Sequence, residues 1–300
     1  MNRKIKNVTD SVRARLLKIA KATERNFNAV LLQYFQERLL YRLSISPYKD
    51  QFILKGALLF LVYNIPAIRP TKDIDFLSMA TDNQEHNLLK LVRKIIKIKV
   101  KDGVWFDSTS LTIETIKENA VYSGTRIHFI AYLGKAKTRF HIDIGFGDKI
   151  VPEPYELDFP VFLDDMPIPK LIAYSPDSAI AEKFEAIVYL GYITSRMKDF
   201  FDIYHIAHNK DFDSQTLKKA LETTFKHRKT DLLNRFDIYS SEFINNIQKN
   251  KQWNAFKIRN ELEFELTFAD TVGFIKSFIE PVFKNDKNKK WNCKKLLWEK

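Results

Sequence analysis

Residues 52–76, FILKGALLFLVYNIPAIRPTKDIDF, hold the strongest fold signal in the chain. A short apolar run and a Lys-Gly step lead into a second apolar run, then into a connector broken by proline. This order predicts a strand, a helix and a second strand. Because side chains alternate between the two faces of a strand, Asp73 and Asp75 would project together. Ile74 and Phe76 would point into the core.

The Asp-x-Asp pair suggests a metal site. Two adjacent carboxylates repel each other and lose hydration when they are buried, and a divalent cation removes that cost. Mg²⁺ is commonly held by one or two carboxylates together with substrate phosphates. Taken alone, such a pair is more often an exposed strand end or a turn.

Neighbouring residues favour the metal-site interpretation. Gly56 lies where the expected strand meets the expected helix, and backbone N–H groups at such a junction can hold phosphate. Lys55 and Arg69 add positive charge nearby. A third carboxylate, Asp143, lies in a later alternating segment, so the pattern as a whole suggests metal-assisted nucleotidyl transfer.

The segment 138–144 alternates well and predicts a strand, with His141 and Asp143 on the face opposite its apolar residues. A buried Asp needs a partner. That partner is either a metal shared with the two earlier aspartates, or a salt bridge to Arg139 or a nearby lysine. We expect His141 to support the site rather than to bind the metal directly.

These motifs resemble the nucleotidyltransferase superfamily pattern of Gly-[Gly/Ser], a spacer and Asp-hydrophobic-[Asp/Glu]-hydrophobic. More narrowly, Leu-Lys-Gly-Ala-Leu followed by Arg-Pro-Thr-Lys-Asp-Ile-Asp-Phe is similar to the AbiEii/AbiGii toxin family. The usual wording there is Lys-Gly-Gly-[Thr/Ser]-x-Leu, then Arg-x-[Ser/Thr]-x-Asp-hydrophobic-Asp. This chain departs from it with Ala57 in place of the second glycine.

The resemblance implies an enzyme that uses a nucleoside triphosphate with Mg²⁺ or Mn²⁺. The metal ligands, which are also catalytic residues, would be Asp73, Asp75 and Asp143. The nucleotide would be bound by Lys55, Gly56, Ala57, Arg69, Thr71 and Lys183.

Two helices in the C-terminal half carry further candidates. Ser175 is a helix cap, and a second helix begins near residue 194. On that second helix Asp199 and Asp202 are three residues apart and therefore share a face. From the residues alone, Lys198 with Asp202 is an ordinary exposed pair. In the family a Glu-Lys helix is followed by Arg-x-x-Lys-Asp-hydrophobic-hydrophobic-Asp, which implies catalytic roles for Lys183 and Asp199 and a weaker candidacy for Asp202.

The composition limits the number of domains and the classes of protein that the chain can belong to. With 300 residues, 45% of them hydrophobic, the chain fits one large or two small globular domains. It contains no apolar run long enough to cross a membrane, and no apolar segment follows its basic N-terminus as in a secretory signal. A single cysteine, Cys293, excludes an intramolecular disulfide. We therefore expect a cytoplasmic protein without a membrane partner.

The net charge of +12 favours a polyanionic partner. Two clusters contribute strongly. One lies in the tail 284–300, and the other comprises Lys90, Arg93, Lys94, Lys97, Lys99 and Lys101. Each cluster taken singly is more simply a solvated helix face or a frayed end.

We expect an α+β fold with an α/β-like core. An N-terminal helical lead-in (1–48) would precede a nucleotidyltransferase core (49–170), in which a mixed sheet is flanked by helices. A helical C-terminal domain (171–300) would follow, with the active site in the cleft between the last two. The proline-rich segment 145–174 reads as the bridge between them.

The resemblance implies a toxin of a toxin–antitoxin or phage-defence system, opposed by a cognate antitoxin. We expect the acceptor of the nucleotide to be RNA, such as tRNA, in preference to a protein or a small molecule. Two alternatives remain open from the residues: a catalytically inactive scaffold that binds RNA or a partner, and a metal-dependent nuclease or glycosyltransferase.

Overall fold

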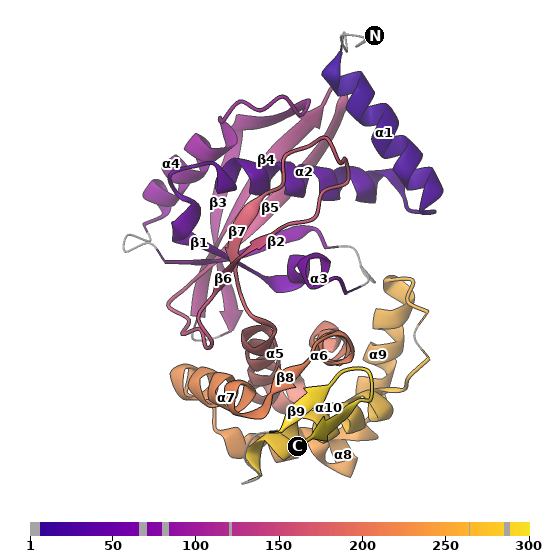
Figure 1. Cartoon of the computed structure of the whole chain (residues 1–300). Helices are drawn as coiled ribbons and strands as arrows, with labels where there is room; N and C mark the ends of the chain where they lie inside the picture. The colour runs from indigo at the N-terminus through magenta and orange to yellow at the C-terminus, as the bar shows by residue number, and fades with distance from the viewer. Residues whose placement is uncertain (1–6, 66–70, 80–83, 120–121, 264, 285–288) are drawn as a thin grey trace. The chain divides into compact units, whose positions relative to one another are not determined.

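The computed structural model describes residues 7–65, 71–79, 84–119, 122–263, 265–284 and 289–300. They form two compact units (Figure 1). The sheet unit comprises Met1–Val62, Thr71–Gly147 and Glu156–Ala173, and the helical unit comprises Tyr63–Pro70, Asp148–Tyr155 and Tyr174–Lys300. No helix among the described residues is long and apolar enough to cross a membrane.

The sheet unit is built on seven strands in the order β3-β4-β5-β2-β1-β7-β6. In chain order they are β1 (Phe52–Lys55), β2 (Asp73–Ser78), β3 (Val104–Asn119), β4 (Tyr122–Leu133), β5 (Ala136–Phe146), β6 (Tyr155–Asp158) and β7 (Lys170–Ala173). The sheet is mixed, because β2 pairs parallel with β5 and antiparallel with β1. The expected α+β fold with a mixed sheet is confirmed.

The helices of the sheet unit are α1 (Val8–Ala22), α2 (Phe27–Ser44), the short α3 (Leu59–Val62) and α4 (Glu85–Ile96). Of these, α2 and α4 pack against the apolar face of the sheet. The guanidinium of Arg42 on α2 lies 4.9 Å from the ring centroid of Phe106, and α4 contacts β3. Ile74 and Phe76 are buried on this face, as the alternation in the sequence predicted.

The proline-rich segment 145–174 does more than connect the two units. It supplies β6 and β7, and Ala173 of β7 pairs parallel with Leu54 of β1. The interpretation as a simple bridge was therefore wrong for this part. Each of these strands has only four residues, so their pairing depends on distant partners rather than on a local pattern.

The helical unit contains α5 (Pro176–Leu190), α6 (Met197–Asn209), α7 (Ser214–Arg228), α8 (Ser241–Ile244), α9 (Ile247–Arg259) and α10 (Phe268–Phe283). The Ser175 side chain accepts a hydrogen bond from the Ser178 backbone and Pro176 takes the first helical position, as the sequence predicted. A three-stranded sheet of β8 (Phe212–Asp213), β9 (Lys290–Asn292) and β10 (Leu297–Glu299) completes the unit.

The lysine-rich tail is not frayed in its described part. Trp291 is 1% exposed, and its Nε1 donates a hydrogen bond to the Ala207 carbonyl at 2.7 Å. Trp298 stacks on Phe278 with 5.8 Å between ring centroids. The expectation of a frayed end was wrong here because burial of the indole rings anchors β9 and β10.

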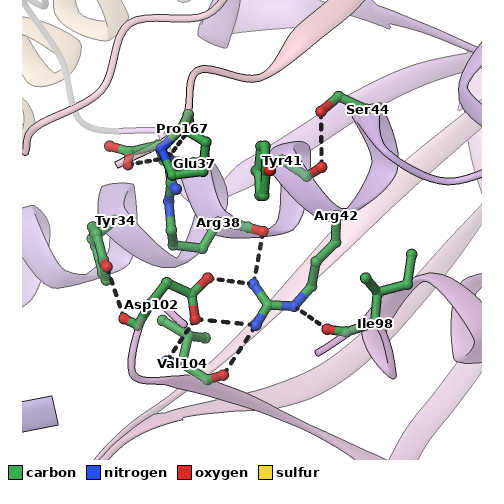
Figure 2. Close-up of polar contacts among 10 residues, drawn as sticks. All are labelled: Tyr34, Glu37, Arg38, Tyr41, Arg42, Ser44, Ile98, Asp102, Val104 and Pro167. Carbon is green, nitrogen blue, oxygen red and sulfur yellow. Dashed lines mark hydrogen bonds and ion pairs between the residues drawn. The ribbon is translucent and has the colours of Figure 1, made fainter. Parts of the chain in front are cut away.

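A buried network of charged residues joins α2 to the loop before β3 (Figure 2). Arg42 donates to both carboxylate oxygens of Asp102, at 2.6 and 3.2 Å, and to the Val104 carbonyl. Arg38 pairs with Glu37 at 2.5 Å and donates to the Pro167 carbonyl. The charges compensate one another, which is what their complete removal from water requires.

Within this network Glu37 gives the fold a pH dependence. Its side chain is 1% exposed and accepts a hydrogen bond from the Phe162 backbone at 2.8 Å. Burial outweighs the attraction of Arg38 and raises the pKa of Glu37 to about 7. The unfolded chain releases this proton near its ordinary pKa of 4.5, so the folded state binds more protons between these values.

We therefore predict that the free energy of unfolding falls as pH rises from about 5 to 7, with up to about 3 kcal/mol of the fall due to Glu37. Urea unfolding at several pH values measures this slope. Glu37→Gln should flatten it, and Glu153→Gln, which alters an exposed carboxyl, should not. Equal slopes in the wild type and Glu37→Gln would contradict the assignment.

Candidate active site

The register of the central strands brings the predicted acidic residues of the sheet unit together. β2 pairs with β5 so that Asp73 lies opposite His141 and Asp75 lies opposite Asp143. Cross-strand partners share a face of a sheet. The three aspartates therefore lie on the polar face, opposite the face that α2 covers, although 68 residues separate Asp75 from Asp143 in sequence.

Asp73, His141 and Asp143 form a cluster of possible metal ligands on this face. The His141 Nε2 atom lies 2.7 Å from Asp73 Oδ1 and 3.9 Å from Asp143 Oδ1. One donor atom from each residue falls within 4.8 Å of the others. The sequence assigned His141 a supporting role, whereas the geometry places it among the possible ligands and leaves Asp75 outside this group of three.

Arg126 on β4 is the residue that sequence reasoning missed. Its Nε and Nη2 donate to the two carboxylate oxygens of Asp143 at 2.8 and 2.7 Å. The sequence suggested Arg139 or a nearby lysine as the salt-bridge partner of Asp143, but in the structure Arg126 makes that contact. The hydrogen bond to Asp143 raises the pKa of Arg126. The only signal in the sequence was a basic residue in a strand whose register could not be foreseen.

The cluster fits a divalent cation in its donor chemistry. Carboxylate oxygens suit Mg²⁺ and Mn²⁺, and an imidazole ligand extends the choice toward transition metals such as Mn²⁺. Asp73 and His141 can supply a donor each. Asp143 accepts one hydrogen bond from Arg126 on each oxygen, and each oxygen keeps a second lone pair that could bind the metal as well.

Position 56 needs a glycine because the carboxylate of Asp75 occupies the space that a side chain there would take. The φ of Gly56 is +74°, and a Cβ at this position would lie 1.9 Å from Asp75 Oδ2. No other residue type fits there without displacing the carboxylate. Ala57 is not among the described residues with positive φ. Replacing the family's second glycine with Ala57 therefore costs no backbone strain.

The sequence also predicts nucleotide contacts for Lys55, Thr71 and Arg69. Lys55, the register partner of Asp75, is 6% exposed, and its Nζ lies 3.6 Å from where a Cβ on Gly145 would be. Thr71 donates from Oγ1 to the Asp73 carbonyl at 3.4 Å. Arg69 lies outside the described residues.

A second cluster lies within the helical unit. Lys183 on α5 contacts Asp202 at 2.7 Å and Asp199 at 3.4 Å, both on α6. Arg196 also pairs with Asp199. The prediction that the two aspartates share a helix face is confirmed. The prediction of an exposed pair between Lys198 and Asp202 was wrong, because Asp202 is fully buried and faces Lys183.

The charge balance of this cluster keeps Asp199 ionised. Burial by itself would raise the pKa of Asp199, but the positive charges of Lys183 and Arg196 outweigh it and lower the pKa to about 2. Lys183 retains partial exposure, with 14% of its side chain accessible. It can therefore meet an anionic ligand at the surface of this unit. That this surface faces the aspartates of the sheet unit stays a prediction.

The mixed sheet, its register-aligned acidic cluster and the adjoining Gly56 turn are consistent with the nucleotidyltransferase fold. The family model described as "Nucleotidyl transferase AbiEii toxin, Type IV TA system" matches residues 38–273. The chain belongs to this family, as the resemblance implied.

Comparison with curated proteins finds no significant match. Among solved structures, the crystal structure of JHP933 from Helicobacter pylori is similar at 16% identity and a TM-score of 0.46, over 85% of this chain and 95% of that one. A second H. pylori structure, provisionally described as a nucleotidyltransferase, has 15% identity and a TM-score of 0.43 over 87% of this chain and 100% of that one.

The Gly56 turn yields a prediction with a matched control. Gly56→Ala and Gly147→Ala both place a side chain at positive φ, at a cost of about 1–2 kcal/mol. Only the first also forces Asp75 aside, since nothing lies within 4 Å of a Cβ at Gly147. Urea unfolding should therefore show a clearly larger loss of stability for Gly56→Ala. Equal losses would contradict the close contact with Asp75.

A second prediction concerns the cluster of Lys183, Asp199 and Asp202 in the helical unit. Lys183→Met leaves two buried carboxylates without their shared ammonium, and it should lower the free energy of unfolding by about 3–5 kcal/mol. Lys198→Met alters an exposed lysine on α6 and should change stability by less than about 0.5 kcal/mol. Equilibrium unfolding of both variants tests the assignment, which fails if they behave alike.

Proposed function

We propose that this protein transfers a nucleotide from a nucleoside triphosphate to an RNA acceptor such as tRNA. The observation that carries the proposal is the cluster of Asp73, His141 and Asp143 beside the Gly56 turn. Membership of a nucleotidyl transferase family supports the reaction class. The net charge of +12 supports a polyanionic acceptor.

In the proposed reaction an acceptor hydroxyl forms a bond to the α-phosphorus, the bond to the bridging oxygen breaks and pyrophosphate leaves. Asp73 and His141, with Asp75 and Asp143 beside them, would hold Mg²⁺ or Mn²⁺, which supplies charge stabilisation to the phosphates. Asp143 would accept the proton of the attacking hydroxyl. Lys55 and the backbone N–H groups that follow Gly56 would hold the triphosphate.

We assign the nucleotidyltransferase core to residues 49–170, the helical lead-in to 1–48 and the helical domain to 171–300. Lys183 would neutralise triphosphate charge and Asp199 would hold Lys183 in place, with Asp202 as a second support. Arg69 and Thr71 would complete the nucleotide site.

The family description places the protein as a toxin of a type IV toxin–antitoxin system. We propose that it acts in the cytoplasm, that a cognate antitoxin opposes it and that the pair serves in phage defence. Toxicity would then follow from modification of the RNA acceptor.

One observation favours a second candidate function. Arg126 donates to both oxygens of Asp143 and so compensates the charge of this carboxylate without a metal. This arrangement would suit a scaffold that binds RNA or a partner without catalysis. Metal-dependent nucleotide transfer separates the two functions directly.

The test is transfer of label from each α-³²P nucleoside triphosphate to total bacterial RNA, with Mg²⁺ or Mn²⁺, followed by a denaturing gel. We expect label in RNA of tRNA size, abolished by chelation of the metal. Asp73→Asn should lower the rate by about 100-fold or more.

The control is Asp158→Asn, which alters an exposed carboxylate on β6 at the far edge of the same sheet. It should transfer at the wild-type rate. RNA binding without any transfer would favour the scaffold. Shortening of RNA without a nucleotide would indicate a nuclease.

A further inference from the structure

The polar face of the sheet extends well beyond the candidate active site. Along β5, the side chains that share a face with Asp143 are His141, Arg139 and Lys137. The register of β4 places Tyr132 opposite Lys137, at the far end of this row. Six residues of strand separate Lys137 from Asp143, a distance of about 20 Å.

This far end carries an aromatic pair in which the indole of Trp105 is exposed. Trp105 on β3 is the register partner of Tyr132 on β4, and their ring centroids lie 4.8 Å apart. Trp105 is 58% exposed, whereas Trp253 and Trp291 are each 1% exposed. A single exposed ring is unremarkable, so the pair gains meaning only from its surroundings.

Basic side chains lie between the aromatic pair and the active site. Lys137 and Arg139 are exposed on β5, and His128 and Arg126 follow on β4. Within this row of side chains on β4 and β5, the acidic residue is Asp143 of the candidate active site. Glu114 and Asp107 belong to the outer strand β3. Glu114 Oε1 lies 2.9 Å from His128 Nε2, and Asp107 accepts a hydrogen bond from the Thr109 backbone.

Positive charge that tracks a strand toward an exposed aromatic platform is the combination that binds single-stranded nucleic acid. The cations contact the backbone phosphates, while each unpaired base can stack on an aromatic ring. The bases of a duplex are already stacked on one another, so a duplex cannot use the platform in the same way.

We propose that this surface, defined by Trp105, Tyr132, Lys137 and Arg139 and called here the acceptor face, binds the single-stranded end of the RNA acceptor. A base would stack on the Trp105–Tyr132 pair, and the phosphates that follow would contact Lys137 and Arg139. The strand would then run along β5 toward Asp143. The inference rests on the proposed function, because that function determines where the reacting end must lie.

Binding is tested on the full-length protein with a fluorescently labelled 12-nucleotide single-stranded RNA. Trp105→Ala should weaken binding about tenfold, whereas Trp105→Phe, which keeps an aromatic ring, should retain most of the affinity. Titration with the unlabelled RNA should quench wild-type tryptophan fluorescence, and Trp105→Ala should lose that change. A duplex of equal length should bind less tightly and quench little.

The charge contacts have a matched control. Lys137→Glu with Arg139→Glu reverses two charges on the acceptor face, and Lys90→Glu with Arg93→Glu reverses the same two residue types on the exposed side of α4. The first pair should weaken RNA binding about tenfold or more and the second should change it little. Equal losses from both pairs would overturn the proposal, since they would reflect net charge alone.

Transfer of labelled nucleotide separates failure of this inference from failure of the proposed function. If the wild type labels RNA and Trp105→Ala does so with unchanged KM for the RNA, the acceptor face is wrong and the function stands. If no variant labels RNA but single-stranded RNA still quenches Trp105, the face stands and the function fails. Label found on protein instead of RNA would overturn the acceptor face.

Discussion

The parallel pairing of β2 with β5 is the constraint on which the candidate active site depends. It sets Asp73 opposite His141 and Asp75 opposite Asp143. A slip of one residue would turn one of these strands over, sending its acidic side chains into the apolar core. The alternation of Ile74 and Phe76 with the aspartates prevents that slip, because the free energy gained by burying them is lost in any other register.

Opposite charges then hold the aligned carboxylates in place. Arg126 forms two hydrogen bonds with Asp143, and Lys183 bridges Asp199 and Asp202 in the helical unit. In both clusters a cation compensates carboxylates removed from water.

Charged residues that stabilise the fold and charged residues that we propose to bind ligands lie on opposite faces of the sheet. On the apolar side, Arg42 and Asp102 form a closed ion pair with no exposure of the carboxylate. On the polar side, the basic residues of β4 and β5 remain accessible and lead away from the acidic cluster. Because alternate side chains of one strand face opposite sides, the same strands can support both a sealed core and an open binding surface.

The sequence by itself determined the features that depend on local pattern. Alternation placed Asp73 and Asp75 on one face, the three-residue spacing placed Asp199 and Asp202 on one helix face, and the Lys-Gly step marked the turn at Gly56. The tertiary structure decided which distant residues meet these: Arg126 and His141 at the aspartates, Lys183 at Asp202. It also decided that short β7 joins the sheet and that Trp291 anchors the tail. Periodicity reports which way a side chain points, whereas partners far apart in sequence follow from strand register and packing, which no local pattern encodes.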